Sequence, residues 1–319
     1  MDMGSGLRDV RALASAQTGA RPNKPVYSSE EKRVNVPKVA AARRPQMKPK
    51  LGQHFLASDE YASRIADAVG DVSQSTVLEI GPGRGIITSL LAKRARRLIA
   101  VELDRVLAAQ LRLKFGMVRN VEVIEADILA VDFDSLFGPK PGLGRPGIEL
   151  HPEPVRVVGN LPYYITSDIL LRLFEFSKYF ESMVIMVQRE VADRIAAKPG
   201  GSDYGMLSAT AQLYARVEKL FTLPPGVFSP PPKVHSTVLR LTLEPQQEKL
   251  GVEGDGFIDF LRLSFGQKRK TLWNNLKLKY PESDLRRALA QTKVKPAARA
   301  ETLSLGQSAA LFRALRKFE

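Results

Sequence analysis

The chain has 319 residues, with 44% hydrophobic and 26% charged side chains, which is enough for one large domain and a small one around a substantial buried core. It contains no cysteine and only three widely separated histidines, so disulfides and a cysteine nucleophile are excluded and no metal site is expected. The net charge of +14 favours a polyanionic partner, and the lack of an apolar run of roughly 20 residues excludes a membrane span.

The positive charge is concentrated at the two ends of the chain. Residues 1–50 hold eleven Lys/Arg and four Asp/Glu, and residues 262–319 hold fourteen and four, whereas the middle is nearly neutral. Clustered Lys and Arg displace counterions from phosphates, which suits a nucleic acid, but a solvated helix face and a disordered tail would explain the pattern equally well. Residues 1–47 are aperiodic and rich in Pro, Ser, Ala and Arg, and we expect a mobile basic tail there.

From residue 58 onward, helical and strand patterns alternate. Ser58 is predicted to cap a helix at its N-terminus. Apolar strands separated by amphipathic helices indicate a mostly parallel, doubly wound α/β sheet that is covered on both faces. The predicted strands are Thr76–Ile80, Leu98–Val101, Val121–Ile124, Val155–Val158 and Met183–Val187, and the predicted helices are 86–96, 104–115 and 167–177.

The pattern of the chain changes after the fourth helix-and-strand stretch. The Gly- and Pro-rich stretch from Gly138 to Pro154 is predicted to be a surface loop. Val217–Phe221 and Thr237–Leu241 are predicted to form a closing hairpin on the sheet, and the chain is helical from Phe257 onward. We therefore expect three parts, namely the tail 1–47, an α/β domain at 48–245, and a small, basic, all-helical domain at 246–319.

A glycine-rich turn follows the first predicted strand. In Gly81-Pro82-Gly83-Arg84-Gly85 the backbone can approach a ligand that side chains would exclude. Glu102 ends the second strand and can accept hydrogen bonds from both ribose hydroxyls of an adenosine, and Asp127 follows the third strand beside the adenine ring. Because ligands bind at the carboxyl ends of strands in open α/β sheets, these positions predict an adenosine cofactor.

The glycine spacing separates two cofactor classes. Dinucleotide sites use G-x-G-x-x-G, and here Ile86 stands where the third glycine would be. The pattern therefore favours an adenosine cofactor without a pyrophosphate, a description that S-adenosylmethionine fits. The glycine turn could also be purely structural, with no ligand. Among the alternative functions, an NAD-linked oxidoreductase is the weakest.

A second motif follows the fourth predicted strand, at Asn160-Leu161-Pro162-Tyr163. An exocyclic adenine amine is a poor nucleophile, because its lone pair is delocalised into the ring. The side-chain oxygen of Asn160 and the carbonyl of Leu161 or Pro162 can accept the two amine hydrogens and localise that lone pair. Pro162 fixes the backbone direction, and Tyr163 offers a face for the base. The alternative is a strand-ending turn with a core tyrosine.

These motifs together resemble the KsgA/Erm family of ribosomal RNA adenine dimethyltransferases. The resemblance rests on Asn160–Tyr163, Glu79–Gly83 and Val101–Asp104, and it extends over about residues 48–318. Further matches are Leu51–Leu56 with an N-terminal cofactor motif, Phe228–Val234 with a later loop, and Phe265–Leu272 with a C-terminal helix. The resemblance implies a Rossmann-like class I methyltransferase fold that uses S-adenosylmethionine.

The resemblance also implies roles for individual residues. The family pattern often has Asn in place of His54, which could also be a buried helix-entry residue. Phe228 could likewise be a plain core residue, and a solvated helix face could explain the basic run at 268–270. The implied cofactor contacts are His54, Leu56, Gly81, Glu102, Asp127 and Asn160; the implied target-amine contacts are Asn160, Pro162 and Tyr163; Phe228 is implied on the other side of the base. From their charge, the residues expected to contact RNA phosphates are Lys268, Arg269 and Lys270, with Lys277 and Lys279.

The substrate depends on the branch of the family. The KsgA branch modifies two adjacent adenines in a hairpin of small-subunit (16S) rRNA, and the Erm branch modifies one adenine in large-subunit rRNA. The Pro-Pro-Pro-Lys loop and the long C-terminal part favour the KsgA branch, which implies the pre-30S particle as partner, a cytoplasmic location and, by default, a monomer. Alternatives are an Erm-like enzyme, a ribosome-assembly or transcription factor that uses the fold only for binding, and a DNA adenine methyltransferase.

Overall fold

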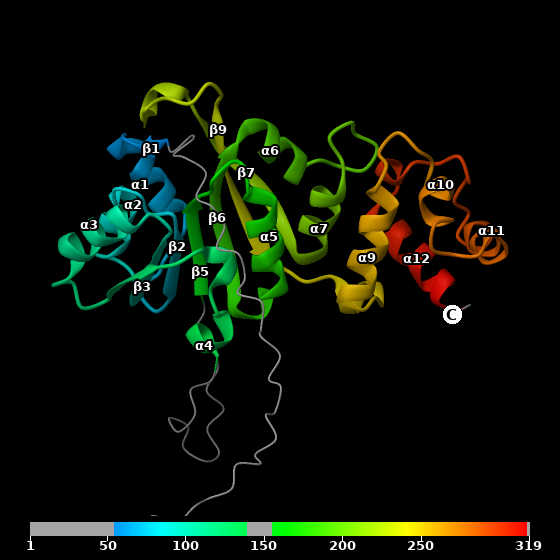
Figure 1. Ribbon diagram of the computed structural model, residues 1–319, viewed down its shortest axis with the longest axis horizontal. Coiled ribbons are helices and arrows are strands. Elements are labelled where there is room, and N and C mark those ends of the chain that lie inside the picture. The colour runs from blue at the N-terminus through cyan, green and yellow to red at the C-terminus, as the bar shows by residue number, and fades with distance from the viewer. Residues whose placement is uncertain (1–53, 139–154, 318–319) are drawn as a thin grey trace, which may run out of the picture. The chain divides into compact units, whose positions relative to one another are not determined.

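The computed structural model describes residues 54–138 and 155–317, all of which belong to one compact unit (Figure 1). The predicted basic tail at 1–47 lies outside the described residues. So does the predicted surface loop, except for Gly138 at its start.

A seven-stranded sheet carries the fold, in the order β4-β3-β2-β5-β6-β9-β7. The first five strands in this order are parallel, and β9 runs antiparallel to both of its neighbours. The mostly parallel sheet and the closing hairpin are therefore confirmed. The strands are β2 (Thr76–Ile80), β3 (Arg97–Glu102), β4 (Val121–Glu125), β5 (Val155–Asn160), β6 (Phe180–Gln188), β7 (Ala215–Leu223) and β9 (Ser236–Leu243).

Helices follow most of these strands. Ser58 caps α1 as predicted, since its hydroxyl accepts a hydrogen bond from the Tyr61 amide at 3.4 Å. The expected helix 86–96 ends at Leu91, because the Asn120 side chain donates to the carbonyls of Ala92 and Ala95 just beyond it. The helices of this part are α1 (Asp59–Ala68), α2 (Ile86–Leu91), α3 (Arg105–Phe115), α4 (Phe133–Phe137), α5 (Thr166–Glu175), α6 (Arg189–Ile195) and α7 (Met206–Tyr214), of which α4, α6 and α7 were not predicted.

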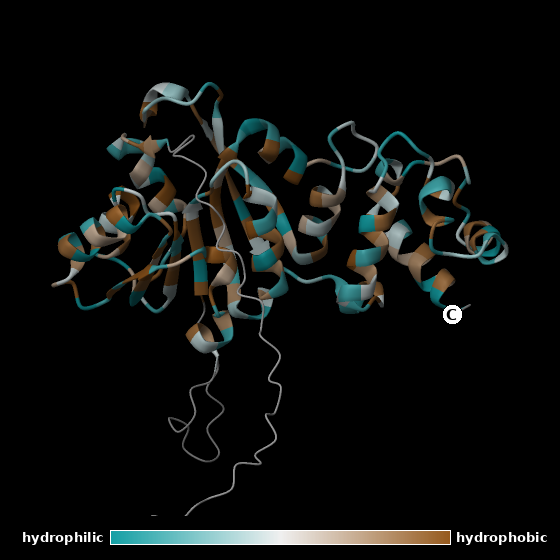
Figure 2. Cartoon of the chain, viewed as in Figure 1, coloured by the Kyte–Doolittle hydropathy of each residue, from teal (hydrophilic) through white to brown (hydrophobic). Residues whose placement is uncertain are grey.

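Alternating side chains of the strands build two apolar cores, one on each face of the sheet. Leu78 and Ile80 of β2 pack into the cluster that includes Leu170 of α5, whereas Val77 packs with Ile65 of α1. Figure 2 shows apolar residues along the strands, and apolar and polar sides alternating along the helices. Burial on both faces explains why these strands read as short continuous apolar runs.

The C-terminal helices share a third apolar cluster. The rings of Phe257 and Phe260 stack in it, Phe312 lies tilted against both, and Leu213 of α7 belongs to the same cluster. None of the described helices is long and apolar enough to cross a membrane. The helices are α8 (Gln247–Leu250), α9 (Gly254–Phe265), α10 (Leu272–Leu276), α11 (Glu282–Gln291) and α12 (Leu305–Arg316).

The segment that resembled one C-terminal helix is interrupted. Helix α9 ends at Phe265 and α10 begins at Leu272, so residues 266–271 form a loop. The Asn275 side chain donates to the carbonyls of Ser264 at 2.7 Å and Gln267 at 3.3 Å, which ends α9 by satisfying carbonyls that a longer helix would use internally. The basic run at 268–270 therefore lies on an exposed loop and not on a helix face.

Glu79 is an ionisable residue inside strand β2, with 2% of its surface exposed. Its Oε2 atom has no hydrogen-bond partner among the residues that the structure describes. Burial raises the pKa of Glu79 from 4.5 to about 7, and the nearby Glu102 carboxylate adds to the rise. A buried neutral carboxyl makes stability depend on pH.

We expect the free energy of unfolding to fall as the pH rises from 4.5 to about 7, because only the unfolded state ionises Glu79 in this window. Glu79→Gln removes this titration. Between pH 4.5 and about 7, the free energy of unfolding of the wild type should therefore fall by up to about 3 kcal/mol more than that of the variant. Urea unfolding at several pH values measures the difference. Glu122→Gln, at an exposed position of β4, is the control, and parallel pH profiles for wild type and Glu79→Gln would contradict the prediction.

Candidate active site

The carboxyl ends of four adjacent strands bring the predicted site residues to one edge of the sheet. Ile80 pairs with Val101 on one side and with Gly159 on the other, and Glu102 pairs with Glu125. These registers place four predicted site residues at neighbouring strand ends. They are Gly81 after β2, Glu102 at the end of β3, Asp127 after β4 and Asn160 at the end of β5.

The glycine turn after β2 has a backbone that other residues adopt only with strain. Gly81, Gly83 and Gly85 have φ angles of 64°, 57° and 75°, in the left-handed region. At Gly83 there is also no space, since a Cβ there would lie 2.8 Å from the Phe55 ring. The Arg84 guanidinium lies 4.9 Å from the centre of the same ring. The glycine turn therefore packs its backbone directly against the Phe55 ring. Sequence reasoning gave Phe55 no role of its own.

Glu102 is buried at the end of β3, with 5% of its surface exposed. Its Oε2 accepts a hydrogen bond from the Gly83 amide and its Oε1 accepts one from the Asp104 amide, each at 3.0 Å. Burial raises the pKa of Glu102 despite these hydrogen bonds. A carboxylate has about four acceptor positions, so each oxygen retains one for a ligand hydroxyl.

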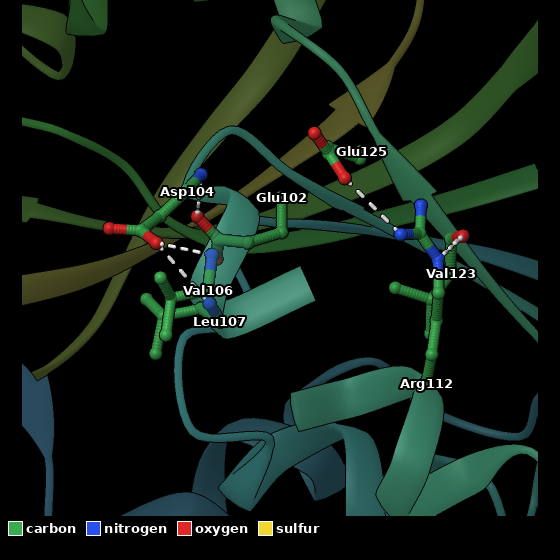
Figure 3. Close-up of polar contacts among 7 residues, drawn as sticks. All are labelled: Glu102, Asp104, Val106, Leu107, Arg112, Val123 and Glu125. Atoms are coloured by element: carbon green, nitrogen blue, oxygen red, sulfur yellow. Dashed lines mark hydrogen bonds and ion pairs between the residues drawn. The ribbon is translucent and has the colours of Figure 1, made fainter. Parts of the chain in front are cut away.

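The turn from β3 into α3 is stabilised by a second carboxylate, as Figure 3 shows. Asp104 caps α3, because its Oδ1 accepts hydrogen bonds from the amides of Val106 at 2.8 Å and Leu107 at 3.2 Å. On the neighbouring strand, Arg112 forms an ion pair with Glu125 at 3.2 Å. These contacts hold the backbone on both sides of Glu102 in place.

Asp127 is half-buried beyond the end of β4. Its Oδ1 accepts a hydrogen bond from the Leu129 amide at 2.9 Å. Its other oxygen accepts none from residues 54–138 and 155–317, so it can accept an amine hydrogen from a ligand.

The Asn160 side chain is oriented by one hydrogen bond. Its Nδ2 donates to the His54 carbonyl at 3.1 Å, which leaves Oδ1 without a donor in the described part of the chain. The Pro162 carbonyl already accepts hydrogen bonds from the Ile165 amide at 3.3 Å and the Thr166 hydroxyl at 3.0 Å. The Leu161 carbonyl has no such partner among the described residues, so of the two carbonyls that the sequence offered, Leu161 is the open acceptor.

Tyr163 is held in place from two sides. Its hydroxyl lies 3.1 Å from the Ser236 Oγ at the start of β9, and its ring stacks on His54 with centroids 6.0 Å apart and planes at 28°. The His54 Nδ1 lies 2.8 Å from the Pro230 carbonyl, so this nitrogen carries the proton and donates. His54 thus contacts Asn160, Tyr163 and the loop before β9. Sequence reasoning named His54 but had no signal for Ser236.

Leu56 and Phe228 are core residues as the structure places them. They face each other in the short antiparallel pair β1 (Phe55–Leu56) and β8 (Phe228–Ser229) and expose 7% and 4% of their surfaces. Both side chains pack with Val158 and Met186 under the sheet edge. The alternative in which Phe228 is a packing residue is favoured, and a large contact with a base would require it to move.

The basic residues of the C-terminal part lie on a different element from this edge. Lys268, Arg269 and Lys270 are all exposed on the loop between α9 and α10. The Lys268 amine donates to the Ser202 carbonyl at 2.6 Å. The structure thus gathers the predicted cofactor and target-amine residues at the sheet edge, whereas the predicted phosphate contacts come from the helical part.

Comparisons with known proteins point to one family. Residues 44–317 match the family model of ribosomal RNA adenine dimethylases. The chain is 58% identical over 284 residues to the ribosomal RNA small subunit methyltransferase A of Koribacter versatilis, covering 88% of this chain and 100% of the relative. It is 54% identical over 269 residues to the protein of the same name from Acidobacterium capsulatum, covering 84% and 91%.

Two solved structures share the fold over most of the chain. A dimethyladenosine transferase from Plasmodium falciparum superimposes with a TM-score of 0.66 at 24% identity, covering 83% of this chain and 98% of that one. The 23S rRNA methyltransferase ErmE superimposes with a TM-score of 0.58 at 29% identity, covering 82% and 99%. Both resemblances include the helical C-terminal part as well as the sheet.

We expect Glu102→Ala to weaken binding of S-adenosylmethionine about 10- to 100-fold, because hydrogen bonds to a charged group contribute roughly 1.5–3 kcal/mol. The variant also leaves the Gly83 amide without its acceptor. Isothermal titration calorimetry measures the change in Kd. The control is Glu122→Ala, which removes an exposed carboxylate paired with Arg97, and an unaltered Kd for Glu102→Ala would rule out this role.

Proposed function

The chain belongs to the ribosomal RNA adenine dimethylase family, and we propose that it methylates the exocyclic amines of two adjacent adenines in a hairpin loop of small-subunit (16S) ribosomal RNA. The resemblance recognised in the sequence is confirmed, and the cofactor is S-adenosylmethionine. The choice of the small subunit is supported by relatives at 58% and 54% identity that are named for it. The observation that carries the chemistry is the orientation of the Asn160 side chain.

The target amine is activated by acceptors and not by a strong base. We propose that Asn160 Oδ1 and the Leu161 carbonyl accept its two hydrogens, since these are the open acceptors at the end of β5. Accepting both hydrogens favours a tetrahedral nitrogen with a localised lone pair. Pro162 holds the Leu161 carbonyl in position, because the Pro162 carbonyl accepts a hydrogen bond from Thr166 at the start of α5. Most of the rate enhancement then comes from alignment of the amine with the methyl group.

The residues of the sheet edge fit the cofactor. When bound, S-adenosylmethionine supplies an electrophilic sulfonium methyl group. Glu102 has acceptor capacity for the ribose hydroxyls, Asp127 has a free oxygen for the adenine amine, and the turn at Gly81 is free of side chains. We propose that His54 and Leu56 contribute through their backbone, because the Leu56 side chain is buried and the His54 ring is engaged elsewhere.

The target base has one evident platform. Tyr163 is half-buried and fixed by Ser236 and His54, so we propose that the adenine stacks on the ring face that His54 leaves open. Phe228 is proposed to meet the base only at an edge, since 4% of its surface is exposed. A preformed tyrosine lowers the entropic cost of ordering the extruded base.

The remaining assignments concern partners and place. We propose that the enzyme acts as a monomer on pre-30S particles in the cytoplasm, because the site and the basic loop at 268–270 come from one chain. An Erm-like large-subunit specificity is less well supported, with ErmE at 29% identity. A purely binding role would leave the open acceptors of Asn160 and Leu161 without a use.

Transfer of labelled methyl groups to undermethylated small subunits, followed by mass spectrometry of the rRNA, tests the function directly. We expect dimethyladenosine at two adjacent positions of small-subunit rRNA. Label in large-subunit rRNA would point to the Erm-like alternative. Binding without any transfer would favour an assembly factor, and activity on duplex DNA alone would favour a DNA methyltransferase.

We expect Asn160→Ala to lower kcat at least about 100-fold, the usual loss when one positioned polar group is removed from a transition state. The Kd for S-adenosylmethionine should rise only modestly. Single-turnover methylation and calorimetry separate the two effects. Asn274→Ala in α10 is the matched control, and wild-type rates in the Asn160 variant would contradict the mechanism.

Replacing Lys268, Arg269 and Lys270 by Gln should weaken RNA binding most at low salt. If each side chain contacts one phosphate, the slope of log K against log salt should become shallower by roughly 2–3. Binding of the hairpin RNA at several salt concentrations measures the slope. Lys249→Gln, at an exposed position of α8, serves as control, and an unchanged slope in the triple variant would exclude these contacts.

A further inference from the structure

Among the Phe, Trp and Tyr side chains of residues 54–138 and 155–317, Tyr164 alone is exposed. It leaves 74% of its surface accessible, whereas every other described Phe, Trp and Tyr is buried or half-buried. What distinguishes Tyr164 from other exposed apolar residues, such as Met117, is its place directly after Asn160–Tyr163, where a base that enters the proposed site would meet its ring.

The backbone that carries Tyr164 is rigid. Leu161 on one side donates its amide to the Met186 carbonyl at 3.0 Å, and the Pro162 carbonyl accepts from Ile165 and Thr166 on the other. Tyr163 is anchored to Ser236, while Tyr164 makes no hydrogen bond or ring contact with the described residues. Adjacent tyrosines thus have opposite roles, since one is fixed within the site and the other is presented to solvent.

Two cationic side chains lie beside this turn, along with the exposed carboxylates of Asp168 in α5 and Glu190 in α6. The start of β9, which bonds Tyr163, pairs with Gln188 at the end of β6, and the next residue, Arg189, donates its amide to the His235 carbonyl at 3.0 Å. Arg189 and Lys233 are both exposed. A polyanion that enters the site from this side meets these two cations together with the Tyr164 ring.

We propose that Tyr164 stacks on the unpaired nucleobase that flanks the target adenine in the RNA. The inference rests on the proposed function. When the adenine leaves its stack, its neighbour loses a stacking partner, and the exposed phenol ring provides a replacement. Because any base can stack on a phenol ring, Tyr164 would raise the affinity for RNA with an unpaired loop relative to a paired stem. It would contribute little to the rate of the methyl-transfer step.

The test uses hairpin RNA from the small subunit with 2-aminopurine at either position flanking the target, because its fluorescence falls on stacking. We expect quenching with wild type and Tyr164→Phe, and its loss with Tyr164→Ala. KM for the hairpin should rise roughly tenfold in Tyr164→Ala, while kcat stays within about threefold. Met117→Ala, at a position that is 96% exposed beyond α3, controls for loss of an exposed apolar side chain.

An RNA with an abasic residue at the position whose fluorescence is quenched completes a double-mutant cycle with Tyr164→Ala. It should raise KM for the wild type by the same factor and leave Tyr164→Ala unaffected, because both changes remove one stack. The inference would be overturned if the abasic RNA and Tyr164→Ala together raised KM by the product of their separate factors. An unchanged KM in Tyr164→Ala, or the absence of quenching with wild type, would also overturn it. Quenching by wild type without methyl transfer would instead refute the proposed function and leave the stacking contact standing.

Discussion

The hydrogen bond from the Asn160 amide to the His54 carbonyl is the contact on which the arrangement of the site depends. It joins two segments 106 residues apart in the chain, and it decides which end of the Asn160 amide faces a ligand. If the amide were reversed, a donor would face the amine of the proposed target adenine and could not accept its hydrogens. The same His54 stacks on Tyr163 and donates to the Pro230 carbonyl, so one residue aligns acceptor, platform and loop.

The cofactor side of the edge is ordered by a different physical constraint, which is the burial of charge. Glu102 is kept under the glycine turn by amides of Gly83 and Asp104, and Glu79 lies next to it without a partner for one oxygen. Burial is the main reason why the pKa of each carboxyl is raised, with a smaller contribution from a neighbouring carboxylate, which is Glu102 for Glu79 and Asp104 for Glu102. The ribose-binding role proposed for Glu102 therefore uses a carboxyl whose ionised form is stabilised by the two amides that bind it.

In the proposed function, target recognition divides between a tyrosine that is fixed in advance and side chains that are exposed. Tyr163 is fixed before RNA arrives, while Tyr164 and the basic loop at 268–270 remain exposed. This division matches the physics of RNA recognition, in which phosphate contacts supply affinity and stacked bases in open loops supply selectivity. One turn, from Asn160 to Thr166, carries both Tyr163 and Tyr164 and so links the two proposed functions.

The sequence by itself determined the parallel sheet, the cap at Ser58, the glycine turn and the placement of Glu102, Asp127 and Asn160 at strand ends. Each of these follows from local chemistry, because strand periodicity, capping and left-handed glycines depend on neighbours in the chain. Only the tertiary structure decided that Leu161 offers the open carbonyl, that Phe228 and Leu56 are buried, and that a loop interrupts the helix at 266–271. Those outcomes depend on hydrogen bonds and packing between distant segments, such as Asn275 with Ser264 and β1 with β8, which no local pattern encodes.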